Sequence, residues 1–425
     1  MNFRPALMAV VVSSAFAALQ AQAGGFQLTE QSALGLGRSY AGVGVDGADV
    51  SGAYYNPATM TLHSGTTVQA GVIGVDLNLE YEGENGHTEN GREKASAVPH
   101  LFVVHQFNDQ IYAGLSITTP FGMQTSYGWN WDLNHRGYYS KIMTVDINPS
   151  VAWKINEKFS VGAGISYQYV DATLKTAKEG VNPLTGRSLG QLNAKFNADS
   201  GEWGWNIGAM WTPAENVRVG LSYRSEIEHT AKGDLELSSA ASNAALASQV
   251  NQGLAMMGMD SMAGEAVVSA PAWAMLNVAW DVNPQWSVYG TLRWTDWSSF
   301  SELSIKTAKG TGTSIDNRWK DTYFGSVGFD YRFNPTWTFR AGIGLETNPI
   351  KYADTRTGVI PDAKRLWLSL GGTYHATERF TIDFGAAHLH GIGERDMYDE
   401  VGGEKVGKFK RLDAFLLGAQ MQYRF

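Results

Sequence analysis

Two runs of alternating side chains, joined by four residues, stand at positions 202–228 of the sequence: EWGWNIGAMWTPAENVRVGLSYRSEIE. Successive side chains of an extended strand point to opposite faces. Here large apolar side chains take every second position, with small or polar side chains between them, and the connection Pro213 to Asn216 has the residue types of a tight turn. The segment is therefore predicted to form a hairpin with one apolar face. That face comprises Trp203, Trp205, Ile207, Ala209, Trp211, Val217, Val219, Leu221, Tyr223 and Ile227.

The same pattern recurs along the rest of the chain and predicts fourteen strands. They are expected near 66–81, 95–107, 110–120, 139–155, 158–176, 199–213, 216–236, 269–282, 285–306, 317–333, 336–348, 364–376, 379–390 and 408–425. Short turns rich in Asn, Asp and Pro alternate with long connections, which are expected at 82–94, 121–138, 177–198, 237–268, 307–316, 349–363 and 391–407. Alternating short and long connections are typical of periplasmic turns and extracellular loops. The sequence predicts an all-β fold, a fourteen-stranded antiparallel transmembrane β-barrel.

The first 23 residues have the features of a secretory signal peptide. Arg4 precedes an apolar core, and Ala21-Gln22-Ala23 provides a small-x-small cleavage site, so we expect the mature chain to begin near Gly24. No later run approaches the roughly 18 apolar residues of a membrane-spanning helix. The formal net charge of −8 argues against nucleic acid as a partner. Export together with 48 Gly, 50 aromatic residues and no Cys favours a bacterial outer-membrane protein.

Residues 24–65 differ from the rest of the chain. They are rich in Gly and small residues and show neither strand alternation nor a helical stripe. A compact irregular segment ahead of a barrel is expected to be a hatch, a plug inside the lumen, with 66–425 as the barrel. The segment contains G-x-G-x-x-G at 42–47, but a nucleotide site would need this motif between a strand and a helix of a βαβ unit. Close packing in a narrow lumen explains these glycines better.

The C-terminal strand and two of the connections carry further signals. Alternate positions from Phe415 to Phe425 are mostly apolar, and the chain ends on an aromatic residue, as the outer-membrane assembly machinery would read. The connection 121–138 has a heavy aromatic load, and 237–268 is predicted to form one or two short helices with a Met-rich apolar surface. These two connections are candidates for a lid, a docking site for an apolar ligand, or both.

Catalytic and metal chemistry find little support. The sequence has no G-x-S-x-G elbow and no Cys nucleophile. His388 and His390 share a strand face, but the spacing offers no third ligand, so neither a metal nor another cofactor is predicted. Asp146, Glu226, Asp330 and Asp383 are expected to pair with cations in the lumen. By strand parity Lys320 should share the lumenal face with Phe324, and Arg365 should share it with Trp367. A cation beside lumenal aromatic side chains suits a carboxylate with an apolar tail.

At these residues the chain resembles the FadL family of outer-membrane transporters of long-chain fatty acids and hydrocarbons. The resemblance runs over the mature chain. It is carried by Gly25-Phe26-Gln27-Leu28, Gly35-Leu36-Gly37-Arg38, Asn56-Pro57-Ala58, Trp294, Trp297-Ser298, Phe300, Lys320-Asp321, Trp337 to Arg340, Ile360-Pro361-Asp362, Arg365 and Trp367 to Ser369.

The resemblance implies ligand docking between the two extracellular loops, then binding in a lumenal pocket, then lateral release beside the hatch. The implied docking groove comprises Phe121, Met123, Trp129, Trp131, Leu254, Met256 and Met257. The implied pocket comprises Lys320, Arg365, Phe26, Trp367 and Phe324, and the gate comprises Gly24, Phe26, Leu28, Asn56, Pro57 and Ala58. A second basic position of the family falls at Thr176, which weakens the case for a carboxylate ligand.

Three functions stay open from the sequence. Passive uptake of long-chain fatty acids stands first, uptake of aromatic or alkane hydrocarbons by the same route is an alternative, and a general porin for polar solutes is a third. The expected partners are the hydrophobic ligand, outer-membrane lipids and lipopolysaccharide, and the assembly machinery. We expect the protein to be a monomer.

Overall fold

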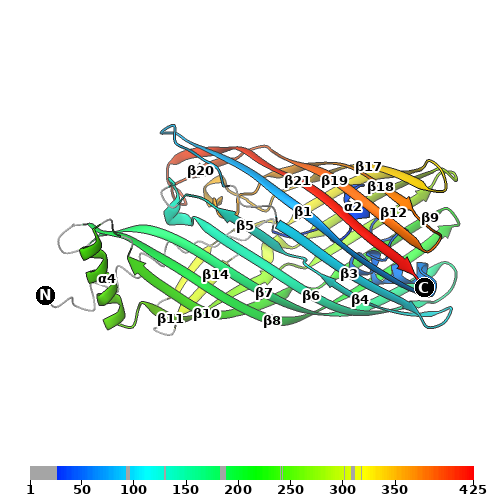
Figure 1. The fold of residues 1–425 in the computed structure, drawn as a ribbon, viewed down its shortest axis with the longest axis horizontal. Coiled ribbons are helices and arrows are strands. Elements are labelled where there is room, and N and C mark those ends of the chain that lie inside the picture. Colours follow the sequence, from blue (N-terminus) through cyan, green and yellow to red (C-terminus); the bar gives the residue numbers. More distant parts are fainter. Residues whose placement is uncertain are drawn as a thin grey trace.

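A computed structural model describes residues 26–91, 96–128, 131–181, 188–239, 241, 243–300, 302–307, 312–316 and 318–425. The expected signal peptide and Gly24 lie outside these residues. In the described part of the chain, fourteen strands form a closed antiparallel barrel, as the alternating pattern predicted. The strands run obliquely along the long axis (Figure 1), with the C-terminus at one end and α4 (Ala244–Met256) at the other.

Several barrel strands consist of two segments separated by a short break. In chain order the wall comprises β1 (Thr66–Gly83), β3 (Ser96–Gln106), β4 (Ile111–Thr118) with β5 (Gly122–Ser126), β6 (Tyr139–Lys154), β7 (Phe159–Val181), β8 (Ser188–Ala214), β9 (Val217–Arg224) with β10 (Ile227–Ser239), β11 (Ser261–Ala270) with β12 (Trp273–Asp281), β13 (Trp286–Thr295) with β14 (Glu302–Thr307), β15 (Gly312–Asp316) with β16 (Thr322–Arg332), β17 (Trp337–Glu346), β18 (Lys364–His375), β19 (Phe380–Ile392) and β21 (Lys405–Arg424). Pairing of β1 with both β3 and β21 closes the ring.

The remaining elements are short. Two small strands, β2 (Thr88–Glu89) and β20 (Asp396–Tyr398), pair with the ends of β1 and β21 respectively. The other helices are α2 (Ala33–Leu36), α3 (Gly52–Tyr55) and the 3-10 helices η1 (Pro57–Leu62), η2 (Asn134–Arg136), η3 (Trp297–Ser299) and η4 (Ala353–Thr355). Among the described residues, no helix has both the length and the apolar character needed to cross a membrane.

The hairpin predicted at 202–228 is present, with one exception on its apolar face. Trp203, Trp205 and Trp211 of β8 are exposed on the outside of the wall, whereas Arg224 of β9 is buried in the lumen. The prediction for Ile227 is wrong, because that side chain is buried. The strand is broken between β9 and β10, so the alternation does not carry across the break.

Several predicted connections are shorter than expected. Within 121–138, β5 takes Gly122–Ser126, and within 307–316, β15 takes Gly312–Asp316. Residues 177–198 were predicted to connect two strands, but β7 and β8 continue to pair there, with Ala177 opposite Asn193. Above the apolar belt the outward side chains are no longer apolar, so the alternation that marks a strand fades while the backbone pairing continues. In 237–268 only the predicted helix, α4, and a few flanking residues separate β10 from β11.

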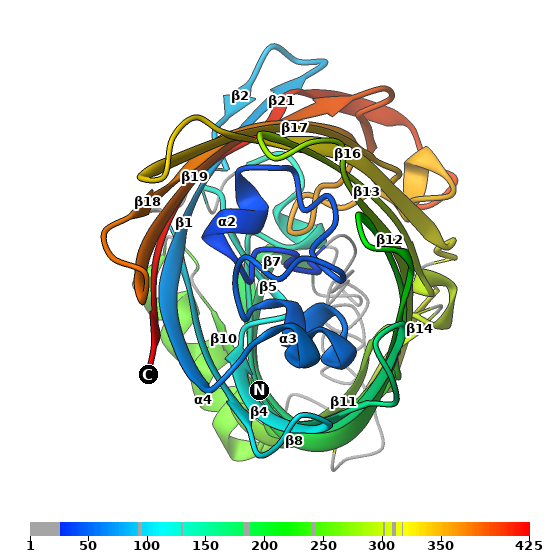
Figure 2. The same cartoon turned by 90° about the vertical axis from the view of Figure 1, so that its right-hand side faces the viewer.

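Residues 26–64, which we call the hatch segment, lie inside the ring of strands, with α2 and α3 visible in the lumen in Figure 2. Arg38 is fully buried and forms ion pairs with Asp46 (2.6 Å) and Asp330 of β16 (3.1 Å). Arg340 of β17 continues this network, at 3.4 Å from Asp330 and 3.4 Å from Asp383. The network fixes the hatch segment to one side of the barrel.

The last strand also holds the hatch segment. Gln420 of β21 accepts a hydrogen bond from the backbone N–H of Ala33 (2.7 Å) and donates to Asp49 (2.8 Å) and Asp383 (3.0 Å). Of the lumenal carboxylates predicted to pair with cations, Asp330 and Asp383 do so, and Asp146 lies 3.6 Å from Arg224. The prediction for Glu226 is wrong, because its side chain is exposed beside the break between β9 and β10.

Small wall residues let the hatch segment approach closely. A Cβ atom at Gly208 of β8 would lie 2.0 Å from the Asn56 side-chain oxygen, and one at Gly162 of β7 would lie 2.7 Å from the Ala58 nitrogen. Asn56 uses this space to donate to the backbone carbonyls of Gly44 (2.9 Å) and Ala209 (3.1 Å), while its oxygen caps η1 at the Ala58 N–H. Asn56-Pro57-Ala58 therefore lies where the hatch segment contacts the wall.

Candidate ligand-binding site

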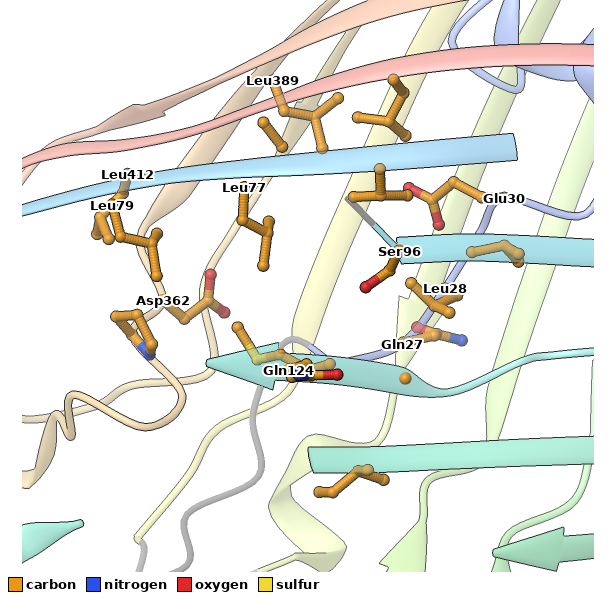
Figure 3. A pocket seen from close by; sticks show the side chains of 18 of the residues that line it. Gln27, Leu28, Glu30, Leu77, Leu79, Ser96, Gln124, Asp362, Leu389 and Leu412 are labelled. Atoms are coloured by element: carbon orange, nitrogen blue, oxygen red, sulfur yellow. The ribbon is translucent and has the colours of Figure 1, made fainter. Parts of the chain in front are cut away.

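A cavity of about 440 Å³ lies between the first residues of the hatch segment and the wall (Figure 3). Its size is in the range of small-molecule sites. Leucines from neighbouring strands line one side, as Figure 3 shows for Leu77, Leu79, Leu389 and Leu412. The polar residues that line it include Gln27, Glu30, Gln124, Asp362 and Arg365. The cavity is amphipathic, with a continuous apolar wall and a few charged groups.

Arg365 lies on the lumenal face, as strand parity predicted, and lines this cavity, but its guanidinium is already engaged. Its Nη2 donates to Asp362 at 2.8 Å, and its Nη1 lies 3.8 Å from Glu346. Glu346 also accepts from Arg293 at 2.9 Å. Burial raises the pKa of Asp362 above its ordinary value, and Arg365 opposes that shift. The arginine is thus held in place by acids at the cavity wall.

Glu30 is a buried carboxyl group of this site that is not fully hydrogen-bonded. It is 5% exposed, and one of its side-chain oxygens has no hydrogen-bond partner among the described residues. Burial raises its pKa to about 7, with a further contribution from the charge of Glu346, whereas Arg365 and Arg293 lower it. Glu30 therefore changes its charge near neutral pH, inside the cavity.

The third barrel strand is broken beside the cavity, and the hatch segment fills the break. Between β4 and β5, Gln27 lies directly opposite Phe121 in an antiparallel bridge. Leu28 donates its backbone N–H to the Pro120 carbonyl (2.8 Å), and Gly122 donates to the Phe26 carbonyl (2.9 Å). The Gln31 side chain donates to the Thr119 carbonyl at 2.7 Å. The start of the hatch segment thus acts as an additional short strand at this point.

The cavity reaches both faces of the wall at this break. Ile142 of β6 is buried and Met143 is exposed on the outer face, yet both line the cavity. On the other side, β3 pairs with β1 from Ser96 but with β4 only from Leu101. Among the described residues, Ser96 to His100 are thus paired with β1 but not with the strand that comprises β4 and β5. The cavity lies along this stretch of the wall.

An apolar cluster connects the hatch segment to the extracellular end. Phe26 lies edge-on to Trp297 at 5.1 Å and against Phe121 at 5.5 Å. The cluster continues to Leu254 of α4, and Met123 and Met257 pack against it. The two predicted docking segments therefore meet in this cluster, although not all of the residues assigned to the groove belong to it.

Two of the predicted groove residues fall elsewhere, and a third is not among the described residues. Met256 is 85% exposed and points away from the cluster. Trp131 is buried in a separate cluster, where it stacks on Tyr127 at 4.1 Å. Trp129 lies outside the described residues, as does Gly24 of the predicted gate.

Not all of the predicted pocket residues line the cavity. Trp367 and Phe324 lie on the lumenal face, with ring centroids 5.8 Å apart, but neither lines the cavity. Trp367 instead packs against Tyr40 of the hatch segment, with ring centroids 6.0 Å apart. The parity prediction for Lys320 is wrong. Lys320 is exposed and precedes β16, while its neighbour Trp319 packs inward against Trp297 at 5.5 Å. The alternation holds only from Thr322 onward.

Sequence reasoning missed Glu30 and Lys141 as cavity residues. Lys141 of β6 lines the cavity beside Ile142, and its Nζ lies 3.9 Å from Asp171. No motif marks either residue, because each is placed by the break in the third strand. Leu28, which was predicted for the gate, does line the cavity.

Comparisons with known proteins identify the family to which this barrel belongs. A model of the family described as outer membrane protein transport protein (OMPP1/FadL/TodX) matches residues 14–425. The long-chain fatty acid transport protein of Escherichia coli O6:H1 is 30% identical over 446 residues, covering 98% of each chain.

Solved structures share the fold. The crystal structure of a Pseudomonas aeruginosa FadL homologue matches with a TM-score of 0.84 at 24% identity, over 95% of this chain and 100% of that one. The P. putida toluene transporter TodX matches with a TM-score of 0.72 at 16% identity, over 92% of this chain and 98% of that one. With its closed barrel and a family match over nearly its whole length, the chain belongs to the OMPP1/FadL/TodX family of outer-membrane transport proteins.

Proposed function

We propose that the protein carries hydrophobic molecules, above all long-chain fatty acids, passively across the outer membrane and releases them sideways through its wall. The observation that carries this proposal is the amphipathic cavity at the broken third strand, which reaches both faces of the wall. The relative from Escherichia coli O6:H1, which bears the name of a long-chain fatty acid transporter, supports the choice of substrate. The proposed role is transport, not catalysis.

The apolar lining supplies the driving force for binding. Burial of apolar surface contributes about 25 cal/mol per Å², so a long acyl chain can bind strongly without nucleotide hydrolysis. The leucine wall of β1, β19 and β21 would receive the chain, and the cluster of Phe26, Phe121 and Leu254 would form the approach from the extracellular end.

The charged end of the cavity also supports a second substrate class. Arg365 could pair with a ligand carboxylate, but Asp362 already accepts from it, and Glu30 lines the same cavity. A neutral hydrocarbon would leave the Arg365–Asp362 pair intact. Uptake of aromatic or alkane hydrocarbons is therefore the second candidate, and the likeness in fold to TodX is consistent with it.

Release requires the hatch segment to leave the break. In this proposal the bridge between Gln27 and Phe121 opens and the bound molecule passes between β3 and β5 into the lipid. Paired residues of an antiparallel bridge lie about 4.5–5.5 Å apart between Cα atoms, which is a distance that a disulfide can span. The native chain has no Cys, so engineered pairs are free of competing thiols.

The test is a disulfide between Gln27→Cys and Phe121→Cys in cells that lack other long-chain fatty acid transporters. Oxidation should abolish fatty acid uptake, and reduction should restore it. The matched control joins Thr66→Cys to His105→Cys, which are opposite each other in the permanent β1–β3 pairing. Oxidation of the control should leave uptake unchanged. Uptake that persists in the fully oxidised Gln27–Phe121 variant would rule out this release route.

A general porin is distinguished by conductance. The hatch segment and its ion pairs occupy the lumen, so the purified protein should pass no steady ion current in a planar bilayer. A steady current from the wild-type protein would favour the porin. The exposed apolar outer face should contact membrane lipid, with lipopolysaccharide above it. A single chain carries the whole proposed site, so the protein can act as a monomer.

A further inference from the structure

The outer face of the wall carries a cluster of two imidazoles and one carboxylate to which the proposed function assigns no role. β19 and β21 are neighbours, and His390 lies directly opposite Asp413 in their register. Leu389, Leu412 and Ala414 line the cavity inside the barrel. Side chains alternate along strands, so His388, His390 and Asp413 share the opposite, outward face. His388 and His390 do not line the cavity, whereas Asp413 is among the residues that line it.

The donor atoms of the three side chains converge. His390 Nδ1 lies 2.9 Å from one Asp413 oxygen, and His388 Nε2 lies 3.8 Å from the other. All three donor atoms lie within 4.8 Å of one another. A tetrahedral Zn²⁺ with ligands at about 2.0–2.2 Å holds its donor atoms roughly 3.3–3.6 Å apart. Small side-chain adjustments would bring these three donors to that spacing.

The surroundings orient two of these ligands. The His388 ring is stacked on Phe415, with centroids 4.4 Å apart and planes at 10°. Its Nε2 atom is buried and has no hydrogen-bond partner in the part of the chain that the structure describes. Asp413 also accepts from the backbone N–H of Gly391 at 3.3 Å. Hydrogen bonds of this kind position metal-ligating carboxylates in known sites, and a buried ring nitrogen without a partner is the atom that a metal would satisfy.

The site lies at the upper edge of the apolar belt, where water can reach it. Toward the periplasm the outward face of β21 continues with exposed Phe415 and Leu417. In the other direction it continues with exposed Lys410 and Arg411. His388 and His390 are themselves 34% and 49% exposed at their side chains. The exposed side chain of His390 therefore offers an ion from the aqueous side its first contact with the cluster.

We propose that His388, His390 and Asp413 form a binding site for Zn²⁺ on the outer wall, which links β19 to β21. Two imidazoles and one carboxylate are the ligands of zinc and other late first-row metals, whereas Mg²⁺ and Ca²⁺ prefer oxygen ligands alone. Three protein ligands leave one position for water or another small donor. The sequence indicated only the His pair, because Asp413 reaches it solely through the pairing of β19 with β21.

The test uses tag-free protein in detergent, titrated with Zn²⁺ calorimetrically and with Co²⁺ by its visible absorption. One equivalent should bind with a tetrahedral Co²⁺ spectrum, and Zn²⁺ should displace Co²⁺. His390→Asn and Asp413→Asn should each weaken binding at least about tenfold. His388→Phe should do the same while keeping the stacking on Phe415, so a loss in this variant reports the missing nitrogen and not a misplaced strand.

The chain offers a matched control in His87 and Asp132. Their side chains are 3.0 Å apart and similarly exposed, and no third metal-ligating side chain joins them among the described residues. His87→Asn should leave the affinity unchanged. The proposal is overturned if the wild type binds no stoichiometric Zn²⁺, or if the three site variants bind as tightly as His87→Asn. Heat-modifiable mobility in gels verifies that each variant is folded.

Discussion

Arg365 donates a 2.8 Å hydrogen bond to Asp362 across one end of the cavity, and Glu346 stands 3.8 Å from the same guanidinium. A buried charge is costly without a partner, so arginine and acid stabilise each other at the cavity wall. A ligand carboxylate must therefore compete with an internal one. This competition gives the cavity a means of distinguishing acids from neutral hydrocarbons.

Asp362→Asn should raise the affinity for a long-chain fatty acid anion by roughly tenfold, because Arg365 loses its competing carboxylate while Asn retains the oxygen that accepts from Ala363. Arg365→Gln should lower that affinity and leave alkane binding little changed. Displacement of a fluorescent fatty acid from purified protein measures both. Lys320→Ala is the control, since Lys320 is exposed away from the cavity, and equal losses in both variants would contradict this assignment.

Glu30 should make anion binding depend on pH. Its folded-state pKa of about 7 lies above the ordinary value of 4.5, so affinity for a long-chain alkyl sulfonate, which stays ionised throughout, should fall as pH rises from 6 to 8. Glu30→Gln should remove this dependence. An unchanged pH profile in the variant would show that another group titrates.

The same shift affects stability. A raised acid pKa contributes stability that is complete below about pH 4.5 and is lost as pH rises through about 7, a change of about 3 kcal/mol. Glu30→Gln should therefore flatten the pH dependence of the unfolding free energy over this interval. Urea unfolding in vesicles at several pH values measures it.

Gly342→Val should displace the hatch segment and open the lumen to ions. A Cβ atom at position 342 would lie 2.2 Å from the Arg38 backbone, which is itself fixed by two ion pairs. Steady conductance in a planar bilayer is the expected result. At Gly290, on the outer face, the nearest atom to an added Cβ is 3.9 Å away, so Gly290→Val should remain closed. A closed Gly342→Val barrel would mean that the wall yields in place of the hatch segment.

Leu254→Ala and Met256→Ala test whether uptake depends on the packed face of α4 or on its exposed surface. Leu254 is 1% exposed in the cluster that contains Phe26, whereas Met256 is 85% exposed. Loss of Leu254 should destabilise the docking of α4 by about 2–5 kcal/mol, with faster hydrogen exchange in α4 and slower uptake. Met256→Ala should change neither. If both variants slow uptake equally, the exposed surface of α4 contributes to docking.

The sequence alone predicts most of the barrel wall, but it predicts the candidate site only in part. Trp203, Trp205 and Trp211 revealed their outward face, because lipid contact imposes a strict alternation on the strands. Above the belt this constraint disappears, so the alternation predicts a loop where Ala177 and Asn193 are in fact paired. Ile227 and Lys320 were misplaced because each adjoins a break, where parity is reset.

The cavity depends on interactions that periodicity does not record. Glu30 and Lys141 come together because the hatch segment pairs with residues 120–122, a contact that joins distant parts of the chain. Arg365 lies on the lumenal face that strand parity predicted, since it lies within a regular strand. The engagement of its guanidinium by Asp362 is a matter of side-chain geometry, which strand alternation does not specify.

Gln420 connects the hatch segment, near its start, to the strand that completes the ring. Its amide bonds to Ala33 and Asp49 on one side and to Asp383 on the other, at the seam where β21 meets β1. A closed cylinder would admit this filled interior only with difficulty, so we expect residues 26–64 to be enclosed before β21 pairs with β1. A chain lacking them should close more slowly during refolding into vesicles, as gel mobility would record.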